Sequence, residues 1–200
     1  LIYLKKRVLM LRIISQNIIN YGIEIPDDTI LRINLAWCSS IKQLRNILEE
    51  HKNNSIFIDL PIKRIKPPNN KYTLNDLISV ISSYSQIKYF AISNVESASD
   101  LEDYIQNIPP NIILVPKIES PIAIQNVSEI VNAIPTDEKI LMLDHDDLFS
   151  KIIKNNESID SFQNYIQKLS DYCNSNKIIL LRTIGVMFSD EEKRISEYIK

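Results

Sequence analysis

IILVPKIE at Ile112–Glu119 and ILMLDHDD at Ile140–Asp147 are the two stretches that decide the fold of this chain. Each opens with four apolar residues and ends in acidic residues, and the first also carries a lysine. A short apolar run bounded by turn residues is typical of a buried strand in a parallel sheet. The segment between the two runs has apolar residues at helical spacing, so it predicts a helix connecting two parallel strands.

Charged residues close both of these strands. The carboxyl ends of parallel strands meet at one edge of the sheet, which is where barrels and open α/β sheets carry their chemistry. Lys117, Glu119 and Asp147 are therefore expected to face one crevice. Two carboxylates from neighbouring strand ends can hold a hard divalent cation such as Mg²⁺ or Mn²⁺, because these ions prefer oxygen ligands.

The composition favours one soluble globular domain over residues 1–200. The chain is 44% hydrophobic and 24% charged, with a net charge of −2, which gives no electrostatic reason to expect nucleic acid as a partner. No apolar run approaches the ~20 residues that a membrane span needs. Cys38 and Cys173 lack a neighbouring cysteine, so we expect buried thiols of a cytoplasmic protein. Only two glycines occur, which excludes a glycine-rich phosphate loop.

The remaining chain alternates between strand and helix patterns. Residues 1–21 fit either a helix ending at Gly22, which we favour, or a first buried strand at Val8–Ile14. Strands are predicted at Thr29–Trp37, Ile56–Leu60, Ile87–Ile92 and Lys177–Thr183, in addition to the two above. Helices are predicted from Ser39 or Ser40 to Glu50, after Thr73, at Ser97–Ile108 and Ser161–Asn174, and at the C-terminus.

Six strands alternating with helices indicate an α/β fold with a parallel sheet. A (β/α)₈ barrel usually takes ~250 residues, so 200 residues leave room for six or seven units. We therefore expect a TIM-barrel-like parallel barrel that is compact or incomplete. A barrel lacking its first or last strand would expose a sheet edge, which favours pairing with another copy.

Two motifs carry a family resemblance. KIES and MLDHDDLF, one helix apart, resemble the KIEN and MVARGDLG pair of pyruvate kinase, and more loosely the wider phosphoenolpyruvate/pyruvate barrel superfamily with its citrate-lyase and aldolase groups. LRINLAW is similar to the family's ARxNFSH, and IFIDLPIKRIK to LLLDTKGPEIR. IQKLSDYCNSNKIILLRTIGVM resembles QKMLIxxCNxAGKPVIxATQML. The landmarks follow the barrel domain of pyruvate kinase in order over most of the chain.

The resemblance implies roles for single residues. Glu119 and Asp147 would bind Mg²⁺ or Mn²⁺, and Lys117 would stabilise charge on a transferred phosphoryl group or an enolate. Arg32 would bind substrate, and Thr183 would lie beside the proton path to the enolate carbon. Other positions of the family pattern fall on Asp146 and Asp147 in the substrate loop, and on Asn34 and Asp59 at a potassium site.

Departures from the family pattern weaken several of these roles. Ala36, Trp37 and Leu60 stand where the family has a serine, a histidine and a threonine, so the potassium site loses oxygens and we do not expect potassium to bind. Asp144 and Asp146 make the substrate loop acidic, which opposes an anionic substrate. The family's lid domain is reduced to residues 63–72, and its regulatory C-terminal domain has no counterpart.

Two classes of function follow. The first is a metal-dependent transferase or carbon–carbon lyase that acts on a small keto- or enol-acid. The second is a catalytically silent barrel that serves as a binding or assembly module. His145 also has two interpretations: a metal ligand or base whose pKa neighbouring carboxylates raise, or part of a solvated acidic turn.

Overall fold

Seven parallel strands form one sheet in the computed structural model, which describes residues 13–15, 25–64 and 67–182. The strands lie in chain order, and each pairs in parallel with the next. They are β1 (Ile13–Ser15), β2 (Ile30–Asn34), β3 (Ser55–Leu60), β4 (Ile87–Ile92), β5 (Ile113–Ile118), β6 (Ile140–Leu143) and β7 (Ile179–Arg182).

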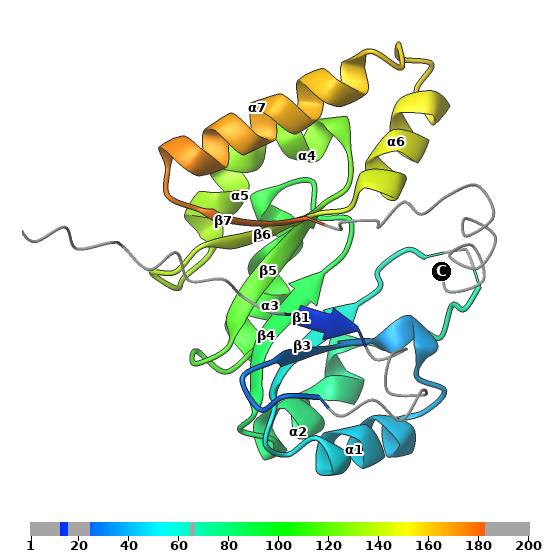
Figure 1. The fold of residues 1–200 in the computed structure, drawn as a ribbon, viewed down its shortest axis with the longest axis vertical. Coiled ribbons are helices and arrows are strands. Elements are labelled where there is room, and N and C mark those ends of the chain that lie inside the picture. The colour runs from blue at the N-terminus through cyan, green and yellow to red at the C-terminus, as the bar shows by residue number, and fades with distance from the viewer. Residues whose placement is uncertain (1–12, 16–24, 65–66, 183–200) are drawn as a thin grey trace, which may run out of the picture.

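The sheet curls into a half-barrel (Figure 1). This confirms the expected α/β fold with a parallel sheet, in the form of an incomplete barrel. β1 and β7 are the outer strands, so the described part of the chain does not close a TIM barrel. The helices are α1 (Ile41–Glu50), α2 (Leu74–Ser83), α3 (Glu102–Asn107), α4 (Pro121–Gln125), α5 (Val127–Ala133), α6 (His145–Lys154) and α7 (Ser161–Ser175), with 3₁₀ turns η2 (Leu35–Trp37) and η3 (Ala98–Leu101).

Alternating side chains give the sheet two different faces. Leu31, Ile58 and Leu141 belong to a large apolar core that also contains the buried residues of the helices. Their strand neighbours point to the opposite face, because successive residues of a strand alternate. That inner face carries a smaller apolar cluster, which includes Phe57 and Met142. The main core therefore lies between sheet and helices, and the inner face is left for the site.

Several helices begin at the capping residues from which the sequence predicted them. The Ser40 side chain accepts the N–H of Gln43 at the start of α1, and Thr73 forms a capping box with Asp76 at the start of α2. Ser120 caps α4, directly after β5. Each cap satisfies a backbone N–H that the first helical turn leaves without a partner. Both cysteines are buried free thiols, as expected.

The structure differs from the prediction in three elements. The N-terminal helix is wrong at Ile13–Ser15, which form β1, so seven strands replace the predicted six. The predicted strand Thr29–Trp37 ends early, because Asn34 caps η2 by accepting the N–H of Ala36. Helix α6 was not predicted, although Asp144 caps it and its first turn carries two acids. The predicted C-terminal helix lies outside the described residues.

Candidate metal and anion site

The alternation of the strands also places the polar residues of the site. Ile30, Phe57, Ala91, Val115 and Met142 belong to the inner apolar cluster. Two residues further along each strand, the side chain returns to the same face but lies nearer the carboxyl end. These second positions are all polar or charged: Arg32, Asp59, Ser93, Lys117 and Asp144.

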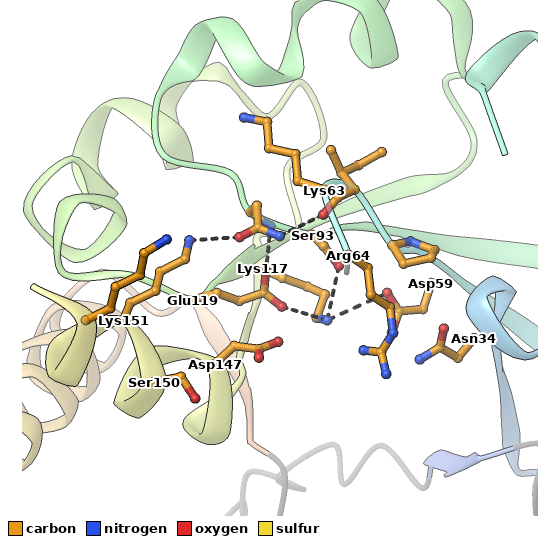
Figure 2. A pocket seen from close by; sticks show the side chains of 14 residues that line it. Asn34, Asp59, Lys63, Arg64, Ser93, Lys117, Glu119, Asp147, Ser150 and Lys151 are labelled. Carbon is orange, nitrogen blue, oxygen red and sulfur yellow. Dashed lines mark hydrogen bonds and ion pairs between the residues drawn. The ribbon is translucent and has the colours of Figure 1, made fainter. Parts of the chain in front are cut away.

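Lys117 lies at the centre of this group. Its Nζ is 2.7 Å from Glu119 Oε1, 3.6 Å from Asp144 Oδ2 and 3.8 Å from Asp59 Oδ1. It also donates to Ser93 Oγ at 3.2 Å. Lys117 is 5% exposed, and Asp59 and Glu119 are each 1% exposed. Figure 2 shows the lysine reaching between Glu119 and Asp59, so one buried ammonium compensates carboxylates from three strands.

The charged state of this group follows from its surroundings. Burial by itself would lower the pKa of Lys117, but Asp59, Glu119 and Asp144 outweigh it and raise that pKa. Burial would likewise raise the pKa of Asp59, but Lys117 and Arg32 hold it below its ordinary value. Arg32 Nε donates to Asp59 Oδ2 at 3.1 Å, and its Nη2 contacts the same oxygen. Lys117 and Asp59 are therefore both charged at neutral pH.

The pKa of Glu119 is shifted in the opposite direction to that of Asp59. Its pKa is raised, first because burial removes water and also because Asp144 repels its negative charge. Lys117 and a hydrogen bond from the Asn94 N–H to Glu119 Oε2, 2.6 Å long, offset this only in part. An additional cation at this carboxylate would favour its ionised form.

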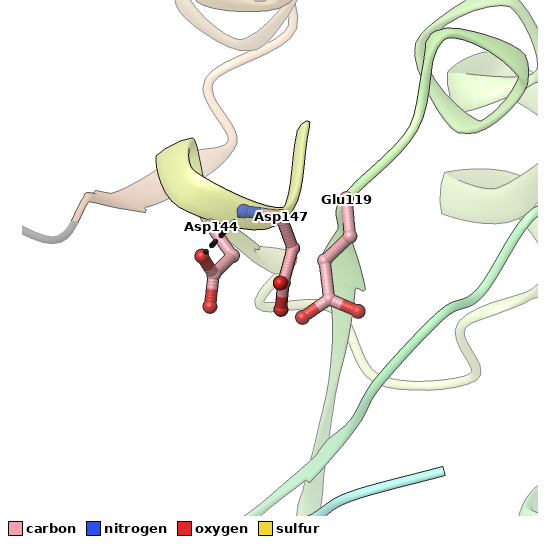
Figure 3. Close-up of side chains that lie close together, drawn as sticks. All are labelled: Glu119, Asp144 and Asp147. Carbon is pink, nitrogen blue, oxygen red and sulfur yellow. Dashed lines mark hydrogen bonds between the residues drawn. The ribbon is translucent and has the colours of Figure 1, made fainter. Parts of the chain in front are cut away.

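Glu119, Asp144 and Asp147 form an acidic triad. Each offers one oxygen, and these oxygens lie within 4.8 Å of one another. The three carboxylates point to the same side in Figure 3. Asp144 also accepts the N–H of Asp147 at 3.2 Å as the cap of α6, which fixes both acids on one helical turn. An all-oxygen set carrying negative charge could hold a hard divalent cation.

A cavity of about 250 Å³ opens at this edge of the sheet. Its walls carry five cationic side chains and three acidic ones. The basic residues come from the loop after β3 and from α6, in addition to Lys117. The sequence analysis expected the acidic loop to repel an anion, but it considered the charges of that loop alone. The basic residues of the wall offset those charges. The lining residues are Asn34, Asp59, Pro61, Ile62, Lys63, Arg64, Ser93, Asn94, Lys117, Glu119, Asp147, Ser150, Lys151 and Lys154.

The structure brings three of the predicted site residues together. Asp59, Glu119 and Asp147 line the same cavity, although 88 positions separate the first from the last in sequence. Asn34 also lines it, beside Asp59 in the strand register, but its side-chain oxygen caps η2. Thr183 lies outside the described residues.

Two predicted substrate-binding residues are not part of the cavity wall. The guanidinium of Arg32 contacts Asp59 and donates to Ser15 Oγ at 3.3 Å, and Arg32 is not part of the cavity wall. Asp146 is exposed on the first turn of α6 and is likewise absent from the wall. Arg32 is thus engaged with Asp59 beside the cavity, and Asp146 faces outward from the first turn of α6.

His145 does not behave as a base whose pKa carboxylates raise. Burial and the nearby Arg182 lower its pKa, and they outweigh Asp144 and Asp146. Its Nε2 is 3.2 Å from Arg182 Nη2, and its ring meets the edge of Phe162 at 6.3 Å between centroids. It is not a member of the acidic triad. The prediction of a raised pKa was therefore wrong, because it counted the neighbours in sequence and not Arg182 of β7.

Ser93, Asn94 and Lys151 are among the residues of the site that sequence reasoning missed. Ser93 and Asn94 directly follow β4, and Lys151 follows Asp147 by one helical turn. Lys151 Nζ donates to Asn94 Oδ1 at 2.8 Å and to Glu96 Oε1 at 3.1 Å. Polar residues directly after an apolar strand were an available signal for the first two. Lys151 could be found only after α6 was recognised as a helix.

Comparison with known proteins identifies the architecture. No family model and no curated protein matches the sequence. Within the described residues, no helix has the length and apolar character needed to cross a membrane. Among solved structures, the chain is similar to RipC from Yersinia pestis, with a TM-score of 0.59 and 16% identity over 94% of this chain and 82% of that one. At this identity the likeness shows a shared fold.

Proposed function

We propose that this half-barrel binds Mg²⁺ or Mn²⁺ at Glu119 and Asp147 and, through the metal, a small keto- or enol-acid of the phosphoenolpyruvate/pyruvate type. The observation that carries the proposal is the acidic triad, whose oxygens lie within 4.8 Å of one another beside a buried lysine and a cavity. Such acids bind a divalent cation through a carboxylate and a neighbouring oxygen. A small keto- or enol-acid needs only a cavity of about this volume, 250 Å³.

The charges around the cavity suit such a ligand. A bound cation would offset the repulsion within the triad, and its remaining coordination positions would be available to ligand oxygens. Lys117, held charged by its three carboxylates, would stabilise negative charge that develops on an enolate oxygen. Arg64 and Lys151 add positive charge on the opposite walls. The anion would therefore be held by the metal and by side chains of the loop after β3 and of α6.

Carbon–carbon lyase chemistry agrees with this site better than phosphoryl transfer does. Lyase chemistry on a keto-acid requires a metal, charge stabilisation and a base within a small cavity. Phosphoryl transfer would in addition need a surface for a nucleotide, and the family's lid is reduced to a short loop at residues 63–72. Lys117 serves both chemistries, so its presence does not separate them.

Calorimetric titration with Mn²⁺ tests the metal site. Wild-type protein should bind one Mn²⁺, and oxalate, a planar dianion resembling the enolate of pyruvate, should bind only when Mn²⁺ is present. Glu119→Gln and Asp147→Asn should each weaken Mn²⁺ binding strongly, because each removes a charged ligand. Asp146→Asn is the matched control and should bind as the wild type does, since Asp146 is exposed and outside the triad. Equal binding by all four proteins would contradict the site.

A silent assembly module is the second candidate, and one observation favours it. Among the described residues, β1 and β7 each pair on one side only. Unpaired strand edges favour association with another copy of the chain. Sedimentation analysis would detect such an assembly, and failure of Mn²⁺ to bind the wild type would make this candidate the better one.

A further inference from the structure

We infer that Asn94 is a positioning residue, which orients the Glu119 carboxylate toward its metal through a left-handed backbone conformation. The inference rests on the proposed function, because Glu119 is the ligand that Asn94 would orient. Asn94 follows β4 and has a φ of 56°. A residue with a side chain is uncommon in this region, and asparagine is among the few that tolerate it.

The unusual backbone has a direct consequence for Glu119. In this conformation the Asn94 N–H points at Glu119 Oε2, 2.6 Å away. Glu119 Oε1 faces Lys117 at 2.7 Å, so the two contacts hold the carboxylate from both sides. Glu119 is 1% exposed, and water cannot replace a lost donor easily at that depth. The orientation of this metal ligand therefore depends on the backbone at Asn94.

The side chain of Asn94 makes two further hydrogen bonds, which link the segment to its neighbours. Its Nδ2 donates to the carbonyl oxygen of Ile62 at 2.8 Å, and its Oδ1 accepts from Lys151 Nζ at 2.8 Å. One residue thus contacts Glu119 directly after β5, the loop after β3 and helix α6, which are up to 57 positions away in sequence (Figure 2). Val95, which follows, is fully buried and anchors the segment.

Two substitutions separate the backbone from the side chain. Asn94→Gly removes both side-chain hydrogen bonds but adopts a positive φ freely, so the N–H can still reach Glu119. Asn94→Ala removes the same hydrogen bonds and also disfavours the positive φ. The two variants differ by one methyl group, so a difference in metal affinity between them reports on the backbone.

The experiment titrates Mn²⁺ alone and follows the free ion by electron paramagnetic resonance. We expect Asn94→Ala to bind Mn²⁺ about 10- to 100-fold more weakly than the wild type, the usual loss when a residue supporting a ligand is removed. Asn94→Gly should bind within about threefold of the wild type, because rescue by glycine follows from the conformational argument. Melting temperatures without metal are measured for both variants, and Asn94→Ser replaces an alanine variant that does not fold.

Asn156 supplies a matched control. It has a φ of 57° after the end of α6, and it belongs neither to the acidic triad nor to the cavity wall. Asn156→Ala should lower the melting temperature through the same conformational cost and leave Mn²⁺ affinity unchanged.

The failure of each idea has its own result. Equal Mn²⁺ affinity in Asn94→Ala and Asn94→Gly, whether normal or weakened, overturns the positioning role while leaving the metal site in place. A wild-type protein that binds no Mn²⁺ overturns the proposed function and the inference with it.

Discussion

Lys117→Met should destabilise the protein strongly, because the substitution removes the ammonium that three carboxylates share. Asp59 and Glu119 are each 1% exposed, and Lys117 Nζ lies 3.8 Å and 2.7 Å from them. Removing one partner of a buried ion pair costs about 3–5 kcal/mol, because the remaining charge stays buried without compensation. For a chain of this length each kcal/mol lowers the melting temperature by ~2–4 °C, so we expect a decrease of roughly 6–20 °C.

The pH dependence of this loss has a definite sign. In the wild type, the raised pKa of Lys117 means that its stabilisation is complete at neutral pH and is lost only at strongly alkaline pH. In Lys117→Met, the buried carboxylates lose their counter-ion, so their pKa values rise and protonation relieves their repulsion. The difference in unfolding free energy between the two proteins should therefore shrink as the pH falls from 8 to 5.

Urea denaturation followed by circular dichroism measures these free energies at each pH. Lys42→Met is a suitable control, since Lys42 is exposed on α1, and substitutions at such positions usually change stability by less than about 0.5 kcal/mol. A Lys117→Met protein within about 1 kcal/mol of the wild type at pH 7 would refute the reasoning. So would a difference that grows as the pH falls.

Three further predictions follow from the same site. Asp59→Asn should cost about 3–5 kcal/mol in urea denaturation at pH 7, because Arg32 and Lys117 lose a buried partner. Because the pKa of Asp59 is lowered, the wild type should lose this stabilisation as the pH falls below about 3.8. A pH series in which the wild type and Asp59→Asn lose stability in parallel would contradict this prediction. Mn²⁺ affinity should weaken as the pH falls, with a midpoint above the ordinary glutamate pKa of 4.5, because the pKa of Glu119 is raised. An affinity that stays the same between pH 7 and pH 4 would count against Glu119 as a ligand. A coupled assay with phosphoenolpyruvate and ADP should yield no ATP, since only residues 63–72 stand where pyruvate kinase, which the sequence resembles, has its lid domain; ATP formation that Lys117→Met abolishes would overturn this.

The sequence by itself determined the strands, the order of the elements and one side of the site. Apolar runs of strand length predicted six of the seven strands, and Ser40 and Thr73 marked helix starts, because caps and alternation are local properties of the chain. The same alternation puts Lys117 and Glu119 on one face of β5 without knowledge of the fold. Their meeting with Asp147 at one edge followed from the parallel arrangement of the strands.

Only the tertiary structure decided which charges became partners. Arg32 pairs with Asp59, and Arg182 of β7 lowers the pKa of His145, through contacts 27 and 37 positions apart that no local pattern records. The strand at Ile13–Ser15 likewise exists through its pairing with β2, although the spacing of its apolar residues also suits a helix. A short apolar segment has only a weak local preference for strand or helix, and a buried charge pairs with whichever charged group the fold places beside it. The strand at Ile13–Ser15 and the ion pairs therefore both depend on contacts made across the sheet.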